Sequence, residues 1–500
     1  MDELLLIVQT INSYLSNYVL IVLLIGAGLF FTIRTRFVQV RCFGEGLKRM
    51  FGGFSLNGEK HKSGMSSFQA VATAIAAQVG TGNIVGACGA ILIGGPGAIF
   101  WMWLTGVFGI ATKYSETYIS MKYRVKDANG RMIGGAMYAL ERGFKHKKLG
   151  KFPAVLFALF TAIASFGIGA SVQSNSLAGA LTSSSLIPGA ADIPTWAIGI
   201  VVTILVAIVI IGGLKKISKV CEKLVPIMAI FYVACCLIII GMNGAYLWDA
   251  IVTILSCAFT GQAAFGGAVG SGIMLALQYG FKRGLFSNES GLGSAPLVAA
   301  SAISKNPARQ ALVSMSGTFW DTVVICLITG LMLVTSLLAN PDLAAIYNNT
   351  MLASNDLSFD SAIGIFSGGA ALATACFESI PVLGPLVLVV GLLCFTYSTM
   401  LGWSQYGDRA ITYLFGTKGI RPYQVVFLIF VFWGCIGGGD LVWNLSDISN
   451  ALMAVPNCIA VLVLSGVIAK GTKYWVYEGR LEEEDTTPIP TVGTVDHPHA

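Results

Sequence analysis

The sequence predicts an all-α polytopic membrane protein with about eleven transmembrane helices, arranged as a 5+5 inverted repeat after one N-terminal accessory helix. Composition is the first observation that predicts it, because 55% of the 500 residues are hydrophobic, 11% are charged and the mean hydropathy is +0.75. Soluble domains carry about 25% charged residues. The spacing of apolar runs and the sorting of basic residues among loops are the other two observations.

Apolar runs of membrane length recur along the whole chain. A hydrocarbon core of about 30 Å takes about 20 helical residues. The first run is not a signal peptide, because Asp2 and Glu3 stand where a basic region belongs and the run ends in FFTIRTRF without a small-residue cleavage site. The eleven expected spans are 17–33, 68–92, 97–121, 153–181, 195–213, 224–242, 260–280, 309–338, 383–414, 424–440 and 448–469.

Basic residues fall in alternate loops between these runs, which predicts the orientation. With eleven spans, the N-terminus lies outside and the C-terminus in the cytoplasm, in a plasma membrane (the inner membrane of a Gram-negative cell). The net charge of +6 then indicates anionic membrane lipid at the cytoplasmic surface, not nucleic acid. The basic segments are 34–62, 122–151, 215–223, 282–309, 409–421 and the tail, whereas 182–194, 243–259, 339–382 and 441–447 contain no Lys or Arg.

Lys113 is the one basic residue expected well inside a span. Glu116 follows three residues later, so we expect a local ion pair rather than a role in transport. The cysteines are mostly scattered singly, with no CxxC, and the histidines fall in loops or the tail, which argues against a metal site in the membrane.

The stretch QVGTGNIVGACG (78–89) lies in the middle of the second apolar run. A dinucleotide-binding turn needs a soluble strand-turn-helix context, which is missing here. Glycines halfway through a span indicate a broken helix, tolerated where the backbone is buried in protein or lines a watery cavity. The alternative is close helix packing through Gly82 and Gly86, which have GxxxG spacing.

A second glycine-rich stretch, TGQAAFGGAVGSG (260–272), occurs five spans after the first. Interrupted segments at corresponding positions of two halves indicate an inverted-repeat transporter, and an odd number of spans per half gives the inversion. The predicted organisation is an accessory helix and loop, two repeat halves and a disordered cytoplasmic tail, at 1–67, 68–259, 260–470 and 471–500.

Six motifs in one order resemble the alanine or glycine:cation symporter family. They are GTGNIVG (80–86), GGPGAIFWMW (94–103), VQSNS (172–176), RGLFSNESGLGSAP (283–296), GTFWDT (317–322) and TMLGWSQYGDRA (399–410). The resemblance, from Phe68 to Leu414, implies a leucine-transporter-like fold and sodium-coupled uptake of small neutral amino acids such as alanine and glycine. Gln78 departs from it, because many relatives have Arg there; a gating salt bridge through that Arg is therefore not expected.

The broken helix supplies donors for the carboxylate of an amino acid: the amides of Gly80, Thr81 and Gly82 and the Thr81 hydroxyl. Carbonyls around Phe265, Gly266 and Gly267 at the second stretch are candidate acceptors for its ammonium group. Gln173 either binds that ammonium or makes an interhelical hydrogen bond.

By analogy with the leucine transporter, the resemblance implies sodium, the coupling ion, at a cluster of oxygens. These are the carbonyls of Ala76, Val79 and Phe395 and the hydroxyls of Ser398 and Thr399, with Asn83 at a possible second sodium site. Thr399 is also a candidate substrate residue. Ser398 and Thr399 taken alone are as well explained by helix packing.

Bulk near the substrate side chain is expected from Phe265 and Trp403, although aromatic residues in spans are usually packing or interface residues. Asn288 and Glu289 are interpreted as part of a cytoplasmic-side segment that caps or gates the pathway, and a helix N-cap by Ser287 or Asn288 is the alternative. Asp321 either structures its span or binds a cation.

A membrane enzyme is disfavoured because no HExxH, GxSxG or Walker motif is present. A channel is disfavoured because two different breaks do not build a filter repeated around a pore. Transport of another substrate such as glutamine, or coupling to protons, remains open.

Overall fold

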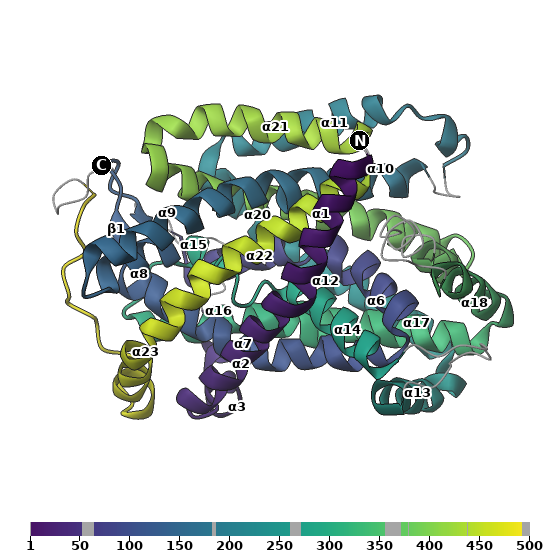
Figure 1. The fold of residues 1–500 in the computed structure, drawn as a ribbon, viewed down its shortest axis with the longest axis horizontal. Coiled ribbons are helices and arrows are strands. Elements are labelled where there is room, and N and C mark those ends of the chain that lie inside the picture. Colours follow the sequence, from purple (N-terminus) through teal and green to yellow (C-terminus); the bar gives the residue numbers. More distant parts are fainter. Residues whose placement is uncertain are drawn as a thin grey trace.

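The computed structural model of the protein describes residues 2–52, 65–182, 187–260, 272–355, 372–378, 380–437 and 439–492. Within these ranges, the strands are β1 (Val125–Lys126) and β2 (Met132–Ile133), which pair antiparallel, and nearly all other elements are helical. Most of the long helices run along the longest axis of the molecule (Figure 1). The predicted all-α class is confirmed.

The N-terminal helix is longer than expected and begins at Asp2. It consists of α1 (Asp2–Tyr14), the π-helical turn η1 (Leu15–Val19) and α2 (Leu20–Arg34), with right-handed helical backbone at both junctions. It packs against α22 (Gly439–Val463), and the two cross the molecule on the same diagonal in Figure 1. Two short helices follow, α3 (Val38–Arg41) and α4 (Phe43–Gly52).

The first predicted repeat half starts at a capping box, in which Ser66 and Gln69 each satisfy the other's backbone amide. Its elements are α5 (Ser67–Gln78), η2 (Gly82–Gly86), α6 (Ala87–Gly94), α7 (Gly97–Lys122), α8 (Ala136–Gly143), α9 (Lys147–Ala164), η3 (Ser165–Ser171), α10 (Val172–Thr182), η4 (Ala190–Asp192), α11 (Thr195–Ile210) and α12 (Gly213–Met242).

The elements after α12 continue across the predicted boundary between the halves at 260, which falls at the end of α13. They are η5 (Gly244–Tyr246), α13 (Leu247–Thr260), α14 (Ile273–Asn288), α15 (Ala295–Ala299), α16 (Pro307–Thr318), η6 (Phe319–Cys326), α17 (Leu327–Ala339), α18 (Pro341–Asn355), α20 (Leu383–Phe415), η7 (Thr417–Gly419), α21 (Ile420–Ile436), α22, α23 (Ser465–Thr472) and η8 (Lys473–Tyr477).

Six helices in the described ranges are long and apolar enough to cross a membrane. They are Lys147–Thr182, Gly213–Met242, Pro307–Ala339, Gly384–Phe415, Thr417–Ile436 and Trp443–Val463. The pair Ser67–Gln78 and Gly82–Gly94, bent by 53° at its break, makes up to seven. The protein therefore has the helices of a polytopic membrane protein, while the count of eleven, the orientation and the repeat stay predictions.

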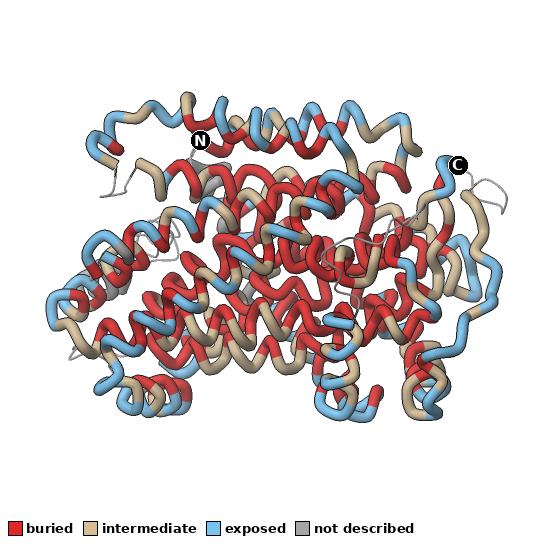
Figure 2. The backbone as a smooth tube through the Cα atoms, turned by 180° about the vertical axis from the view of Figure 1, so that it is seen from behind, coloured by how far each residue is buried: buried red, intermediate tan, exposed pale blue. Residues whose placement is uncertain are grey.

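The outer helices carry apolar side chains outward. On α11, Ile204, Leu205 and Ile208 are each at least half exposed, and only a third of the apolar stretch of α21 is buried. Figure 2 shows the central helices buried along much of their length and the peripheral ones alternating between buried and exposed. Such a surface is stable against lipid tails and not against water.

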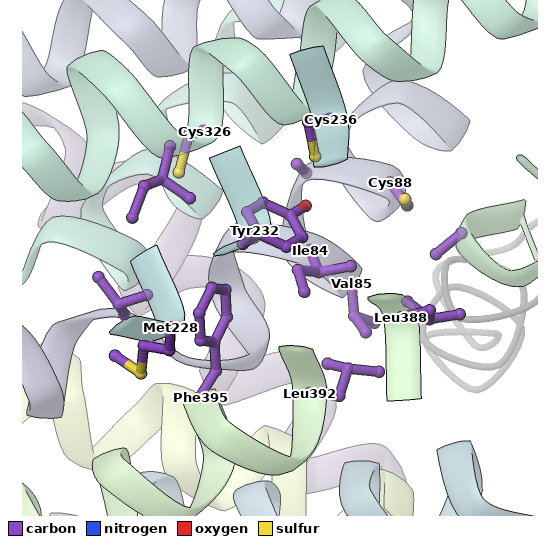
Figure 3. Packing of buried hydrophobic residues seen from close by; sticks show 14 of the residues in the cluster. Ile84, Val85, Cys88, Met228, Tyr232, Cys236, Cys326, Leu388, Leu392 and Phe395 are labelled. Carbon is purple, nitrogen blue, oxygen red and sulfur yellow. The ribbon is translucent and has the colours of Figure 1, made fainter. Parts of the chain in front are cut away.

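A buried apolar cluster packs behind the first break. Phe395 of α20 lies edge-on to Tyr232 of α12, with ring centroids 5.1 Å apart, and Ile84 of η2 lies beside them (Figure 3). The Tyr232 hydroxyl is 2.9 Å from the hydroxyl of Thr329 on α17, so its polar end is satisfied. The cluster fixes η2 and α20 relative to the scaffold helix α12.

The C-terminal segment 481–492 lies across the basic loops, in contrast to the disordered tail expected for 471–500. Asp485 N–H donates to the Lys305 carbonyl at 2.8 Å, and Val492 N–H donates to the Lys126 carbonyl at 2.8 Å. Glu482 accepts from Arg49, Lys305 and Arg309 at 2.7 to 3.0 Å. The composition of this segment indicates disorder, because it has few apolar residues. Distant parts of the chain nevertheless supply partners for its charged side chains and backbone amides.

Glu482 holds this segment in place through its negative charge, and hydrogen bonds from Arg49, Lys305 and Arg309 lower its pKa to about 2. The folded pKa lies below the ordinary value of 4.5, so the stabilisation is complete above about pH 4.5 and is lost as pH falls through about 2. We therefore expect the Asp485 and Val492 amides to be equally protected from hydrogen exchange at pH 5 and pH 7.

The variant Glu482→Gln should lose that protection at both pH values. Glu484→Gln is the matched control, because it removes the same charge two residues away and Glu484 has no ion pair in the described structure. Equal protection in both variants would contradict the proposed role of Glu482.

Candidate functional site

The first predicted break is present and completely buried. Helix α5 ends where Val79 adopts an extended backbone, with φ −75° and ψ 95°. A Cβ on Gly80 would lie 2.7 Å from the Thr399 hydroxyl and 3.1 Å from Gln173 Oε1, so only glycine fits this close approach. A Cβ on Gly86 would meet nothing closer than 3.9 Å, so the alternative of tight GxxxG packing does not explain this stretch.

Four of the predicted sodium ligands converge at this break. The Thr399 hydroxyl lies 3.2 Å from the Ala76 carbonyl, 3.1 Å from the Val79 carbonyl and 2.9 Å from the Phe395 carbonyl. One hydroxyl has one proton, so it cannot satisfy three carbonyls at once. An unwound backbone with clustered oxygens is the arrangement that binds a hard monovalent cation in broken-helix membrane proteins.

Ser398 is the one predicted ligand of this set that does not reach α5. Its hydroxyl donates to the Phe395 carbonyl at 2.9 Å and lies 3.6 Å from Met228 Sδ of α12. The two hydroxyls leave adjacent positions of α20 on different sides of the helix. Within the described ranges, no group of three His, Cys, Asp or Glu residues has a metal-binding arrangement, so the oxygens here are carbonyls and hydroxyls.

Asn83 uses both ends of its amide within the protein. Its Oδ1 accepts from Gly80 N–H at 2.9 Å, and its Nδ2 donates to Asp321 Oδ1 at 2.8 Å. Asp321 Oδ2 accepts from Ser287 at 2.8 Å and from Thr322 at 2.6 Å. In this conformation Asp321 structures its helix and joins it to the first break, which was one of the two alternatives for it.

The predicted substrate residues gather beside the same break. Thr81 N–H donates to Gln173 Oε1 at 3.3 Å, and Gln173 Nε2 donates to the Ile168 carbonyl at 3.0 Å. The Thr81 hydroxyl is buried and has no hydrogen-bond partner among the described residues. Gly80, Thr81, Gln173 and Thr399 therefore surround one point, and Gly82 follows at the start of η2.

Phe265, Gly266 and Gly267 lie outside the described residues. The structure shows a helix interruption further along, between α14 and α15, in the stretch that the sequence analysis interpreted as a capping or gating segment. Glu289 has a left-handed backbone with φ 53°, and Gly291 and Gly293 have φ of 93° and 75°. All residues from 289 to 294 are buried.

This second interruption lies against the first. The Gln78 side-chain amide donates to the Asn288 carbonyl at 2.9 Å, and a Cβ on Gly82 would lie 3.5 Å from the Ser287 Cα. Gln78, the residue that departs from the resemblance, thus joins the two breaks by a neutral hydrogen bond. The sequence signal for this interruption was SGLGS (290–294), whose glycines permit the left-handed backbone.

Lys282 and Arg283 were assigned to a cytoplasmic loop, and that assignment was wrong. Both lie inside α14, where the Lys282 side chain is 13% exposed and pairs with Asp447 of α22 at 3.2 Å. The Arg283 guanidinium lies 5.9 Å from the centre of the Phe286 ring. Charged residues lower the hydropathy of this helix, and their partners are distant in the sequence. Hydropathy therefore ended the expected seventh span at residue 280, whereas α14 continues to Asn288.

A buried ion pair satisfies the backbone of the second interruption. Lys113 and Glu116 of α7 pair at 3.2 Å, as predicted, although both also bind the interruption. Glu116 Oε2 accepts from Gly291 N–H and Gly293 N–H, each at 3.1 Å, and the Lys113 ammonium donates to the Glu289 carbonyl at 3.1 Å. Sequence reasoning did not find this function of the pair.

Trp403 lies one turn after Thr399 on α20 and binds a residue of the second interruption. Its indole N–H donates to Glu289 Oε1 at 2.8 Å, and Ser294 donates to Glu289 Oε2 at 2.6 Å. The ring packs directly on Gly169 of η3 and is fully buried. Trp403 therefore joins α20, η3 and the second interruption.

Comparison with known proteins identifies the family. Residues 1–488 match the model of the sodium:alanine symporter family. The chain belongs to this family. It is 45% identical to the sodium/alanine symporter AgcS of Methanococcus maripaludis, over 93% of this chain and 96% of that protein.

Two further relatives in the sodium:alanine symporter family come from Bacillus subtilis. The probable sodium/glutamine symporter GlnT is 34% identical over 93% of this chain and 90% of its own. The putative sodium/proton-dependent alanine carrier protein YrbD is 33% identical over 92% and 90%. The protein is thus a multi-pass plasma-membrane transporter and not an enzyme.

Glu116→Gln should destabilise the protein by about 3–5 kcal/mol, because it leaves the buried Lys113 ammonium without a counter-charge. Thermal unfolding of the purified protein in detergent measures the loss. The double variant Lys113→Met with Glu116→Gln should regain part of it, because no unpaired charge remains. A double variant less stable than Glu116→Gln alone would refute the charge-pair explanation.

Proposed function

We propose that this protein is a secondary active symporter that couples sodium entry to uptake of small neutral amino acids, first alanine and glycine, by alternating access. The observation that supports it best is the convergence of the Ala76, Val79 and Phe395 carbonyls on the Thr399 hydroxyl. Membership of the sodium:alanine symporter family and the 45% identity to a sodium/alanine symporter agree with it.

Sodium in this proposal replaces the single Thr399 proton as the group that the carbonyls share. The ion neutralises the dipoles at the end of α5, where the helix leaves its last carbonyls without amide partners. It also fastens α5 to α20. A rearrangement that separates these two helices then releases the ion, which is how ion binding and the opening of one side are coupled.

The amino acid in this proposal binds next to that ion. Its carboxylate takes the Thr81 hydroxyl and the Thr81 amide, displacing Gln173 Oε1, which then accepts from the ammonium group. Trp403, fixed by Glu289 and by its contact with Gly169, limits the side-chain space on α20. A small side chain satisfies this arrangement.

The alternating movement is proposed to use two inverted halves, 68–259 and 260–470, with the N-terminus outside. The interrupted helices α5–η2–α6 and α14–α15 lie side by side and begin the two halves. The interruption at 289–294 is a further break in this proposal, because residues 261–271 of the predicted break at 260–272 lie outside the described residues.

Thr399→Val removes the shared hydroxyl at almost constant volume. In proteoliposomes with a sodium gradient, we expect the sodium concentration for half-maximal alanine uptake to rise at least about tenfold, which corresponds to about 1.4 kcal/mol. Ser398→Ala, whose hydroxyl points to Met228, is the matched control and should change it much less.

Unchanged sodium dependence in Thr399→Val would refute the sodium site. Uptake driven by a proton gradient without sodium would overturn the coupling ion, and uptake of glutamine in place of alanine would overturn the substrate.

Gln173→Leu keeps the side-chain volume but removes the acceptor for Thr81 N–H and the ammonium. We expect the KM for alanine to rise about tenfold, from a cost of about 1–3 kcal/mol for a buried amide left unpaired, with a smaller effect on sodium dependence. Asn175→Leu is the control, because Asn175 lies two residues away on α10 and donates instead to the Gly434 carbonyl at 3.1 Å. An equal change of KM in both variants would count against a substrate role for Gln173.

A further inference from the structure

A basic pocket lies at the end of α2, away from the transport site. It has a volume of about 430 Å³ and is formed by the end of α2, by α23 and by η8. Four cationic side chains line it: Arg34, Arg36, Lys470 and Lys473. All four are exposed, and no Asp or Glu lines the pocket.

These four cations differ from the basic residues that hold the C-terminal segment. Arg49, Lys305 and Arg309 share Glu482, and Lys122 pairs with Asp485 at 3.2 Å. Within the described part of the chain, none of the four pocket cations forms an ion pair. Four like charges around one hollow repel one another, and a bound anion relieves that repulsion.

Side-chain contacts hold the wall of the pocket in place. The Tyr477 hydroxyl of η8 donates to the Thr35 carbonyl at 2.6 Å, which ties η8 to the turn after α2. The Arg41 guanidinium lies 4.7 Å from the centre of the Tyr477 ring. In that turn Arg36 has a left-handed backbone with φ 57°, an uncommon conformation that these contacts maintain.

One exposed apolar side chain lines the pocket, and two more follow it closely in the sequence. Ile33, which lines it, is 69% exposed, and Phe37 and Val40 are 52% and 71% exposed. Ile33 lies in the last turn of the apolar helix α2, and Phe37 and Val40 lie just after it, at the start of α3 and inside it. Exposed apolar side chains beside a cluster of cations match a ligand with a charged head and a hydrocarbon tail; a free phosphate ion makes no use of them.

We propose that this pocket binds the phosphate headgroup of an anionic phospholipid of the cytoplasmic leaflet. Arg34, Arg36, Lys470 and Lys473 bind the phosphate oxygens, and Ile33, Phe37 and Val40 contact the acyl chains. The lipid joins the N-terminal helix to the end of α22 through α23. Basic pockets between transmembrane helices on the cytoplasmic side are suited to anionic headgroups.

The test uses the full-length protein in detergent, titrated with phosphatidylglycerol or phosphatidylcholine and examined by native mass spectrometry. The pocket variant carries Arg34→Gln, Arg36→Gln, Lys470→Gln and Lys473→Gln. We expect it to bind phosphatidylglycerol about tenfold or more weakly than the native protein, because each cation near an anionic headgroup contributes. Phosphatidylcholine should bind weakly to both.

The control variant removes four lysines from another part of the basic surface: Lys145→Gln, Lys147→Gln, Lys148→Gln and Lys151→Gln. It has the same net charge as the pocket variant and should bind phosphatidylglycerol as the native protein does. If the pocket variant does not fold, the double variant Arg36→Gln with Lys473→Gln takes its place, with thermal unfolding as the check.

Equal loss in the pocket and control variants would overturn the proposal, because net charge alone would then explain lipid binding. Equal binding of the two lipids by the native protein would overturn it as well. Displacement of phosphatidylglycerol by inorganic phosphate alone would identify a free phosphate as the ligand and overturn the lipid. None of these outcomes depends on transport activity, so the proposed symport is tested separately.

Discussion

The structure depends on one constraint: peptide groups released from a helix inside a membrane must find their hydrogen bonds within the protein. At the second interruption, Glu116 accepts from Gly291 and Gly293, and Lys113 donates to the Glu289 carbonyl. Asn457 of α22 completes the arrangement, since its side-chain amide donates to Glu116 at 3.0 Å and to the Gly291 carbonyl at 2.7 Å. A fully buried ion pair is costly to desolvate, and here its additional hydrogen bonds offset that cost.

At the first break, not every released peptide group has its own hydrogen-bond partner. This difference from the second interruption supports the function proposed for the first break. The amides of Gly80 and Thr81 have side-chain acceptors, but the carbonyls of Ala76 and Val79 share the one proton of the Thr399 hydroxyl. A backbone short of donors is suited to a cation. A static structural break has its hydrogen bonds satisfied, whereas an ion site keeps acceptors in excess.

Within the described residues, the two breaks are connected by hydrogen bonds and not by a salt bridge. Gln78 binds the Asn288 carbonyl, and Asp321 accepts from Asn83 of the first break and from Ser287 beside the second. In the proposed function, a change at the oxygens of the first break reaches α14 through these buried, hydrogen-bonded groups. The neutral Gln78–Asn288 contact separates at a lower cost than a buried salt bridge, which agrees with the proposed opening between the two breaks.

The sequence by itself determined the class of protein, the first break and most of the oxygens that converge on Thr399, which form the proposed sodium site. These depend on local properties: apolar runs, clustered glycines and the motif containing Thr399. The second interruption, the ordered tail segment and the unpaired basic pocket were decided only by the tertiary structure. Gly291 and Glu116 are 175 residues apart, and Arg49 and Glu482 are 433 apart. Hydropathy is a property of neighbouring residues, whereas the satisfaction of a buried charge or amide depends on partners that folding brings together from distant parts of the chain.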